Sequence, residues 1–159
     1  MKKSELIREV VASLNQHLKV LEKAARASHA EATHESSKAE NKYDTRGLEA
    51  AYLAGGQARQ AREFMDAIAV YEDLAPKNFI PSEAIDLTAV VELDANGERT
   101  TYFIGPKSGG LEVPFEGQEI IVITPQSPLG ENLMGKKKGD RWTTKIGGAT
   151  VKHHIVSVL

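Results

Sequence analysis

The residues with the clearest potential for chemistry lie between positions 28 and 47, in the segment SHAEATHESSKAENKYDTRG, which has no large aliphatic side chain. Glu40 and Asp44 are four residues apart, so a helix through them would place both carboxylates on one face. Two other interpretations stay open. The mixed charges could belong to a solvated turn, or the two acids could lie in the first turn of a helix, where acids are favoured. His29 and His34 are five residues apart, which suits no common helical zinc site.

A second group of candidates is a cation-rich stretch near the C-terminus. It comprises Lys136, Lys137, Lys138, Arg141, Lys145 and Lys152. Clustered cations can contact the RNA backbone or an acidic protein surface, and the alternative is a turn that only aids solubility. His153 and His154 are neighbours on a predicted strand and therefore point to opposite faces, so we do not expect them to bind one metal ion.

Proline and glycine usage divides the chain near Ala75. All six prolines lie at or after Pro76, as do ten of the thirteen glycines. Because proline lacks an amide donor and clashes inside helices, the proline-free part can form long helices. The sequence therefore predicts two domains, a helical hairpin stalk at residues 1–75 and a β-rich body at residues 76–159.

Apolar residues in the first part recur at three- and four-residue steps, which is typical of amphipathic helices. The first stripe predicts a helix from about residue 4 to about residue 30 and consists of Leu6, Val10, Leu14, Leu18, Leu21 and Ala25. A second stripe runs from Leu48 to Leu74. A long helix with one apolar stripe needs a partner, so the two are predicted to pack as an antiparallel coiled-coil hairpin with residues 28–47 at its tip.

The second part alternates short apolar runs with turn signals. Strands are predicted at residues 84–93, 98–104, 119–124, 142–146 and 149–158. The turn Asp94–Gly97 joins the first two as a hairpin, and Gly147-Gly148 joins the last two. Residues 128–134 are long enough only for a short helix. The expected fold class is α+β, with the coiled-coil hairpin followed by a small antiparallel sheet and one helix against it.

The composition excludes several classes of protein and of site. Hydrophobic residues make up 41% and charged residues 26%, which is typical of a soluble globular protein. The absence of cysteine excludes disulfides and thiolate zinc sites and fits a reducing cytoplasm. The net charge of -2 gives no overall attraction to nucleic acid. No run has the length of a membrane span, and charged residues interrupt the N-terminal apolar stretch, so we expect neither a membrane partner nor a secretory signal.

One motif resembles a known family. The run ITPQSPLGENLMGKKKGD at residues 123–140 is similar to the signature of the Gre family of bacterial transcript cleavage factors, in which a strand leads into Ser-Pro, a short helix, Gly-Lys and Gly-Asp. The matching residues are Ser127, Pro128, Leu129, Gly135, Lys136, Gly139 and Asp140. The resemblance extends to the domain order, a coiled-coil hairpin followed by a body like an FK506-binding protein.

The resemblance implies a cytoplasmic elongation factor that binds RNA polymerase through Ser127, Pro128 and Leu129 and is not itself an enzyme. In the family the stalk enters the secondary channel, and its tip acids help to hold the second Mg²⁺ of the polymerase, which activates water to cut the 3′ end of backtracked RNA. This implies that Glu40 and Asp44 complete the polymerase's magnesium site, while the chain has no cofactor of its own. Magnesium prefers oxygen ligands and accepts one or two carboxylates in such a shared site.

The tip departs from the family at one position. The family motif is Asp-Leu-Lys-Glu-Asn, and this chain has Ser37-Lys38-Ala39-Glu40-Asn41. The first acid is therefore a serine, and Asp44 or Glu35 could substitute for it. With this departure the resemblance supports equally a second hypothesis, a regulator that occupies the channel without stimulating cleavage. A third hypothesis is a peptidyl-prolyl isomerase, which needs an aromatic pocket. The aromatic residues of the body are adequately explained as core, namely Phe79, Tyr102, Phe103, Phe115 and Trp142.

Overall fold

The computed structural model describes residues 1–35 and 55–159, with the side chains of 28–35 left out. The α+β class is confirmed. The elements are α1 (Lys3–Glu35), α3 (Gly56–Glu72), β1 (Val90–Ala95), β2 (Glu98–Ile104), β3 (Glu112–Phe115), β4 (Gln118–Ile123), α4 (Pro128–Leu133), β5 (Arg141–Ile146) and β6 (Ala149–Val158). The chain divides into two compact units, Val11–Ala69 and a body made of Met1–Val10 with Val70–Leu159. The domain boundary at residues 75 and 76 stays a prediction.

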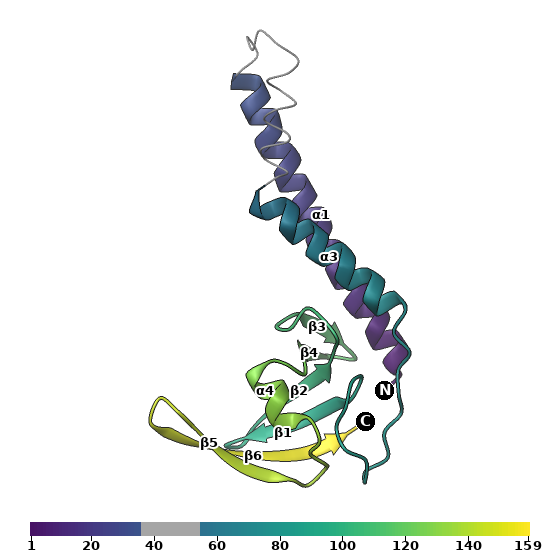
Figure 1. Cartoon of the computed structure of the whole chain (residues 1–159), viewed down its shortest axis with the longest axis vertical. Helices are drawn as coiled ribbons and strands as arrows, with labels where there is room; N and C mark the ends of the chain where they lie inside the picture. Colours follow the sequence, from purple (N-terminus) through teal and green to yellow (C-terminus); the bar gives the residue numbers. More distant parts are fainter. Residues whose placement is uncertain (36–54) are drawn as a thin grey trace. The chain divides into compact units, whose positions relative to one another are not determined.

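The unit Val11–Ala69 contains two helical stretches that lie side by side and run antiparallel (Figure 1). Leu14 of the predicted stripe is fully buried, and on α3 the buried residues include Ala58 and Ala67. Small side chains at such positions allow the two backbones to approach closely. The rings of His17 and Phe64 stack with centroids 5.9 Å apart. Glu40 and Asp44 lie outside the described residues, so their placement on one helical face stays a prediction.

The body contains a six-stranded sheet in the order β3-β4-β2-β1-β6-β5. Four neighbouring pairs are antiparallel, as the sequence predicts, but β2 and β4 are parallel. The sheet is therefore mixed. The chain forms β3 between β2 and β4, and this crossover lets β4 pair with β2 in the parallel direction. The sequence did not predict β3, which is only four residues long and contains Pro114. An edge strand tolerates proline, since a donor can be lost there without breaking the ladder.

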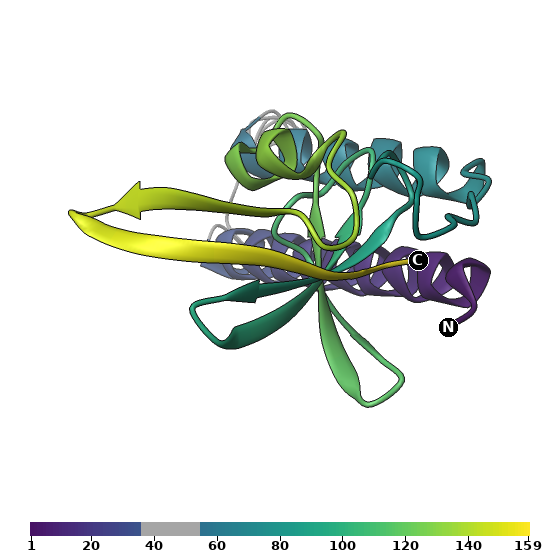
Figure 2. The same ribbon diagram turned by 90° about the horizontal axis from the view of Figure 1, so that it is seen from below.

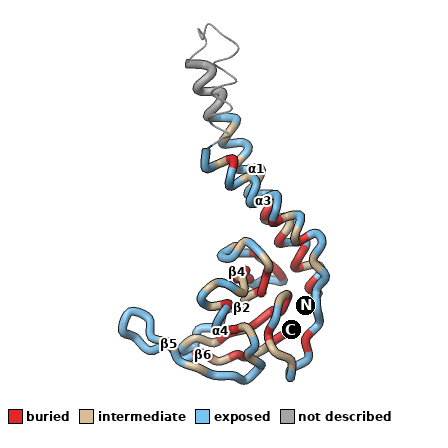
Figure 3. Tube along the Cα trace, in the orientation of Figure 1, coloured by how far each residue is buried: buried red, intermediate tan, exposed pale blue. Residues whose placement is uncertain are grey.

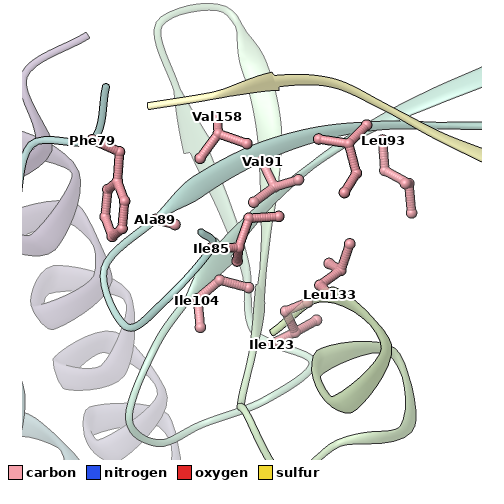
Figure 4. Packing of buried hydrophobic residues seen from close by; sticks show 10 residues of the cluster. Phe79, Ile85, Ala89, Val91, Leu93, Ile104, Ile123, Leu133 and Val158 are labelled. Atoms are coloured by element: carbon pink, nitrogen blue, oxygen red, sulfur yellow. The ribbon is translucent and has the colours of Figure 1, made fainter. Parts of the chain in front are cut away.

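The core of the body lies between the sheet, α4 and the chain before β1 (Figure 4). Its buried residues are Phe79, Ile85, Ala89, Val91, Leu93, Ile104, Ile123, Leu133, Ile155 and Val158. Burial is concentrated in the central strands, whereas β5 and the tip of the β5–β6 hairpin are mostly exposed (Figure 3). The β5–β6 hairpin extends past the ends of the other strands (Figure 2).

Two helix termini belong to the body. Tyr71, at the end of α3, is fully buried, and its hydroxyl donates a hydrogen bond to the carbonyl of Lys107 at 2.7 Å. Burial raises the pKa of this phenol. The ring lies against Gly105, where an added Cβ would be 2.1 Å from the Tyr71 hydroxyl oxygen. A glycine is required at position 105 because no side chain fits beside this ring.

Lys3, in the first turn of α1, is 6% exposed. Its ammonium lies 4.4 Å from the centroid of the Phe79 ring and donates a hydrogen bond to the carbonyl of Lys77. The Lys77 ammonium lies 4.7 Å from the same centroid. Burial, with a further contribution from the Lys77 charge, lowers the pKa of Lys3 to about 8. The Lys77 ammonium also lies 3.6 Å from the Glu83 carboxylate. A hydrogen bond from the Ile80 amide, with a smaller contribution from the Lys77 charge, lowers the pKa of the Glu83 carboxyl.

We expect the free energy of unfolding to rise between about pH 8 and about pH 10, above which ionisation of Tyr71 in the unfolded state opposes the gain. In this window Lys3 is deprotonated in the folded state and protonated in the unfolded state, so the unfolded state binds more protons and stability increases with pH. The gain should be on the order of 2 kcal/mol. Denaturant titrations across this pH range test it, with Lys3→Met as the variant that should lose the slope. An equal slope in Lys3→Met would assign the effect to another group.

Candidate site at the end of β4

The site that the sequence singles out is the α4 segment, residues 124–134, where β4 leads into α4. Ser127 caps the helix from an extended conformation with φ of -68° and ψ of 155°. Its hydroxyl donates to the Thr124 carbonyl at 2.7 Å and accepts from the Gly130 amide at 3.0 Å. Pro128 follows at the first helical position, where its missing amide costs nothing because that donor has no partner within the helix. Ser127 therefore fixes the start of α4.

Gly130 allows this turn to close. A Cβ at this position would be 1.8 Å from the Thr124 carbonyl oxygen and 2.8 Å from the Ser127 hydroxyl oxygen. Sequence reasoning did not select Gly130 as a site residue. A signal was present, because a glycine inside a short helix costs about 1 kcal/mol relative to alanine and such a residue usually marks a close approach. Leu133, one turn later, is fully buried and attaches α4 to the core.

The second half of the signature, residues 135–140, connects α4 to β5. The chain after α4 pairs with Ile85, whose amide donates to the Lys136 carbonyl at 2.7 Å and whose carbonyl accepts from the Gly135 amide at 3.0 Å. Gly135 and Gly139 have φ of 81° and 91°, which favours glycine. The Asp140 carboxylate accepts from the Lys137 amide at 2.8 Å and closes the turn before β5. These residues shape the backbone around α4.

The three residues expected to contact the polymerase differ in exposure. Pro128 is exposed, whereas Ser127 and Leu129 are half-buried. The Ser127 hydroxyl is used in two local hydrogen bonds, and Leu129 packs against the core. The exposed residues beside Pro128 are Gln126, Glu131 and Asn132. Of the three residues, only Pro128 is therefore free to contact a partner as exposed surface, while Ser127 and Leu129 hold it in place.

The cations of the predicted basic patch lie on two faces. The Lys136 ammonium lies 5.1 Å from the centroid of the Trp142 ring, and that ring packs against the core. Arg141 precedes Trp142 on β5 and so points to the opposite face of the sheet. Lys137 and Lys138 are exposed in the turn that joins α4 to β5. The structure therefore separates Lys136 from Arg141.

Trp142 and His153 are stacked on the core side of the β5–β6 hairpin with ring centroids 4.9 Å apart. His153 Nε2 lies 2.8 Å from the Thr144 hydroxyl oxygen. Three other aromatic residues of the body, Phe79, Phe103 and Phe115, are buried, and Tyr102 packs partly buried against the core. These positions agree with the interpretation of the aromatic residues as core.

Among residues 1–27 and 55–159, whose side chains are described, no three histidine or acidic side chains gather closely enough to hold a metal ion. No helix in the same part of the chain combines the length and apolar character needed to cross a bilayer.

Comparisons with known proteins agree with the signature. A family model described as "Transcription elongation factor, GreA/GreB, C-term" matches residues 80–159, which include the α4 segment and the whole sheet. No curated protein sequence matches the chain.

Solved structures resemble the chain at low identity. GreA factor homolog 1 (Gfh1) of Thermus thermophilus is 22% identical, with 94% of each chain covered and a TM-score of 0.39. Gfh1 of Thermus aquaticus is 20% identical, with 91% of this chain and 90% of that chain covered and a TM-score of 0.37. GreA/GreB from Nitrosomonas europaea is 22% identical, with 60% and 78% covered and a TM-score of 0.38. The family match over half of the sequence decides the assignment: this chain belongs to the GreA/GreB family of transcription elongation factors.

Proposed function

We propose that the chain binds bacterial RNA polymerase at its secondary channel and stimulates the cleavage of backtracked RNA by the polymerase. The observation that carries this proposal is the family match over residues 80–159, together with a capped α4 segment that presents Pro128. The body would dock through this segment. The tip of the hairpin would then bring the Glu40 carboxylate, with Asp44 as the auxiliary acid, to the polymerase's Mg²⁺ as an oxygen ligand. The RNA 3′ end would be reached only indirectly.

A second candidate function is a regulator that binds the polymerase and occupies the channel without cleavage. Ser37 favours it, because a serine stands where the family motif has its first acid and a hydroxyl does not supply the missing negative charge. The two candidates share the docking surface and differ only at the tip. Incubation with polymerase stalled on a backtracked transcript separates them: RNA shortening supports the cleavage factor, and co-migration without shortening supports the regulator.

The docking surface is tested at Pro128. We expect Pro128→Ala to weaken binding to the polymerase by about tenfold, the effect of losing about 1.4 kcal/mol at the centre of an interface. The fold should be retained, because the side chain is exposed and Ser127 still caps α4. Binding is measured by co-migration with core polymerase across a concentration series.

The matched control is Pro114→Ala, which removes another exposed proline of the same body, on the edge strand β3. It should bind as the wild type does. Equal binding by Pro128→Ala and the wild type would show that the α4 segment is not the docking surface. Equal weakening by both variants would point to a general effect on the body.

A further inference from the structure

The β5–β6 hairpin and β1 share an outer face, the face opposite Trp142 and the core. Residues paired across neighbouring strands project to the same side. His154 of β6 is paired with Asp94 on β1 and with Arg141 on β5, so these three side chains form one row across the strands. Lys152, two residues before His154, projects to the same face.

A hollow of about 400 Å³ lies over this row and extends to the turn between β1 and β2 at Asn96 and Gly97. It is within the size range of pockets that bind small ligands or single groups of larger ones. Arg141 and Lys152 at its wall are exposed, and His154 is half-buried. The Asn96 side chain closes one end, because its oxygen accepts from the Lys152 amide at 2.8 Å. We call this feature the Arg141 hollow.

The charges at the Arg141 hollow are unbalanced. Its one acid is Asp94, and that carboxylate is already engaged: it accepts from the Gly97 amide at 2.8 Å and lies 3.9 Å from the Arg99 guanidinium. Arg99 also pairs with Glu92 at 3.2 Å. Arg141 and Lys152, in contrast, form no ion pair with any residue in the described part of the chain. The hollow is therefore a local cationic site on a chain whose formal net charge is -2.

The cations continue along the hairpin beyond the hollow. Lys145 lies four residues after Arg141 on β5, on the same face and exposed, and Lys152 is paired with Thr143, midway between them. At about 3.4 Å per residue, successive cations in the series Arg141, Lys152 and Lys145 are separated by about 7 Å along the strands. A row of spaced cations suits a chain of negative groups better than it suits one small anion.

We propose that this outer face binds the backbone phosphates of a single-stranded nucleic acid, with one phosphate seated in the Arg141 hollow. The Arg141 guanidinium supplies paired donors that match the geometry of phosphate oxygens, and Lys152 supplies a point charge beside it. Lys145 receives a neighbouring phosphate. The contact needs neither the α4 segment nor the hairpin tip, so it is independent of polymerase binding and of cleavage.

The test is fluorescence anisotropy of a labelled oligouridylate and of an oligothymidylate with the full chain, in the absence of polymerase, across a salt series. The logarithm of the binding constant should fall with the logarithm of salt concentration with a slope of about -2, the value for three neutralised phosphates of a single strand. Arg141→Gln and Lys152→Gln should each weaken binding by about fivefold at low salt and reduce the magnitude of the slope by about 0.7. Asp94→Asn should strengthen binding, because it removes the acid while keeping the acceptor for the Gly97 amide.

Lys107→Gln is the matched control, since it removes an exposed lysine from the loop after β2, and the Tyr71 hydrogen bond there uses only the Lys107 carbonyl. It should bind as the wild type does. The proposal is overturned if the oligonucleotides do not bind at low salt, or if Lys107→Gln loses as much affinity as Arg141→Gln. It is also overturned if Arg141→Gln weakens only polymerase binding, which would make the face a protein contact. Preference between the two oligonucleotides distinguishes RNA from DNA as the source of the phosphates.

Discussion

Gly130→Ala should abolish binding to RNA polymerase and lower the free energy of unfolding of the body by about 3 kcal/mol. The new methyl carbon would lie 1.8 Å from the Thr124 carbonyl oxygen and 2.8 Å from the Thr124 carbonyl carbon. Both are backbone atoms, so no side-chain rotation relieves the clash. The turn between β4 and α4 must open, which breaks the two hydrogen bonds of the Ser127 hydroxyl and displaces Pro128. Thermal or denaturant unfolding and co-migration with polymerase measure the two effects.

Gly109→Ala is the control for this experiment. Its Cβ would meet Thr124 at 3.5 Å or more, which is ordinary van der Waals contact. We expect nearly unchanged stability and unchanged binding. If Gly130→Ala unfolds at the wild-type midpoint and still binds, the close packing of the α4 segment is not needed for docking. If it is destabilised but binds fully, the docking surface lies elsewhere on the body.

Glu40→Gln should reduce cleavage of backtracked RNA by about hundredfold or more while leaving polymerase binding intact. The amide keeps the shape of the side chain but removes the charge that would help to hold the magnesium ion, and losses of this size are typical when one electrostatic contact to the reacting groups is removed. Asp44→Asn should cause a smaller loss. Ser37→Asp should raise cleavage, because it restores the acid that the family motif has at this position. RNA shortening on stalled complexes is the measurement.

Glu31→Gln serves as the matched control, since it removes a tip acid that does not align with the family motif. It should cleave as the wild type does. Cleavage that survives Glu40→Gln unchanged would remove Glu40 from the mechanism. Tight binding by the wild type without any cleavage, followed by a gain in Ser37→Asp, would select the channel-occupying regulator.

Local sequence patterns determined the class of the fold. The stripe containing Leu6, Val10 and Leu14 predicted α1, and all three side chains are fully buried. The turn signals at Asp94–Gly97 and Gly147-Gly148 predicted two hairpins, and both pairs of strands are present, with β1 extending to Ala95. Such patterns are readable because helix period, strand alternation and turn chemistry depend on neighbours in the sequence. The signature at residues 123–140 indicated the family for the same reason.

Contacts between distant parts of the chain were decided only by the tertiary structure. The parallel pairing of β2 with β4 depends on the crossover through β3, whose four residues and proline give no local strand signal. Lys3 contacts the Phe79 ring and Tyr71 packs against Gly105, and in both cases the partner lies far away in the sequence.

The tertiary structure also decided which cations lie together. Lys136 and Arg141 look like one patch in the sequence, but strand alternation around Trp142 separates them, while Lys152, eleven positions after Arg141, joins Arg141 at the hollow. A sequence determines which side chains share an element. Which elements lie together is set by packing and pairing across the fold, because those energies depend on partners that only the folded chain brings within reach.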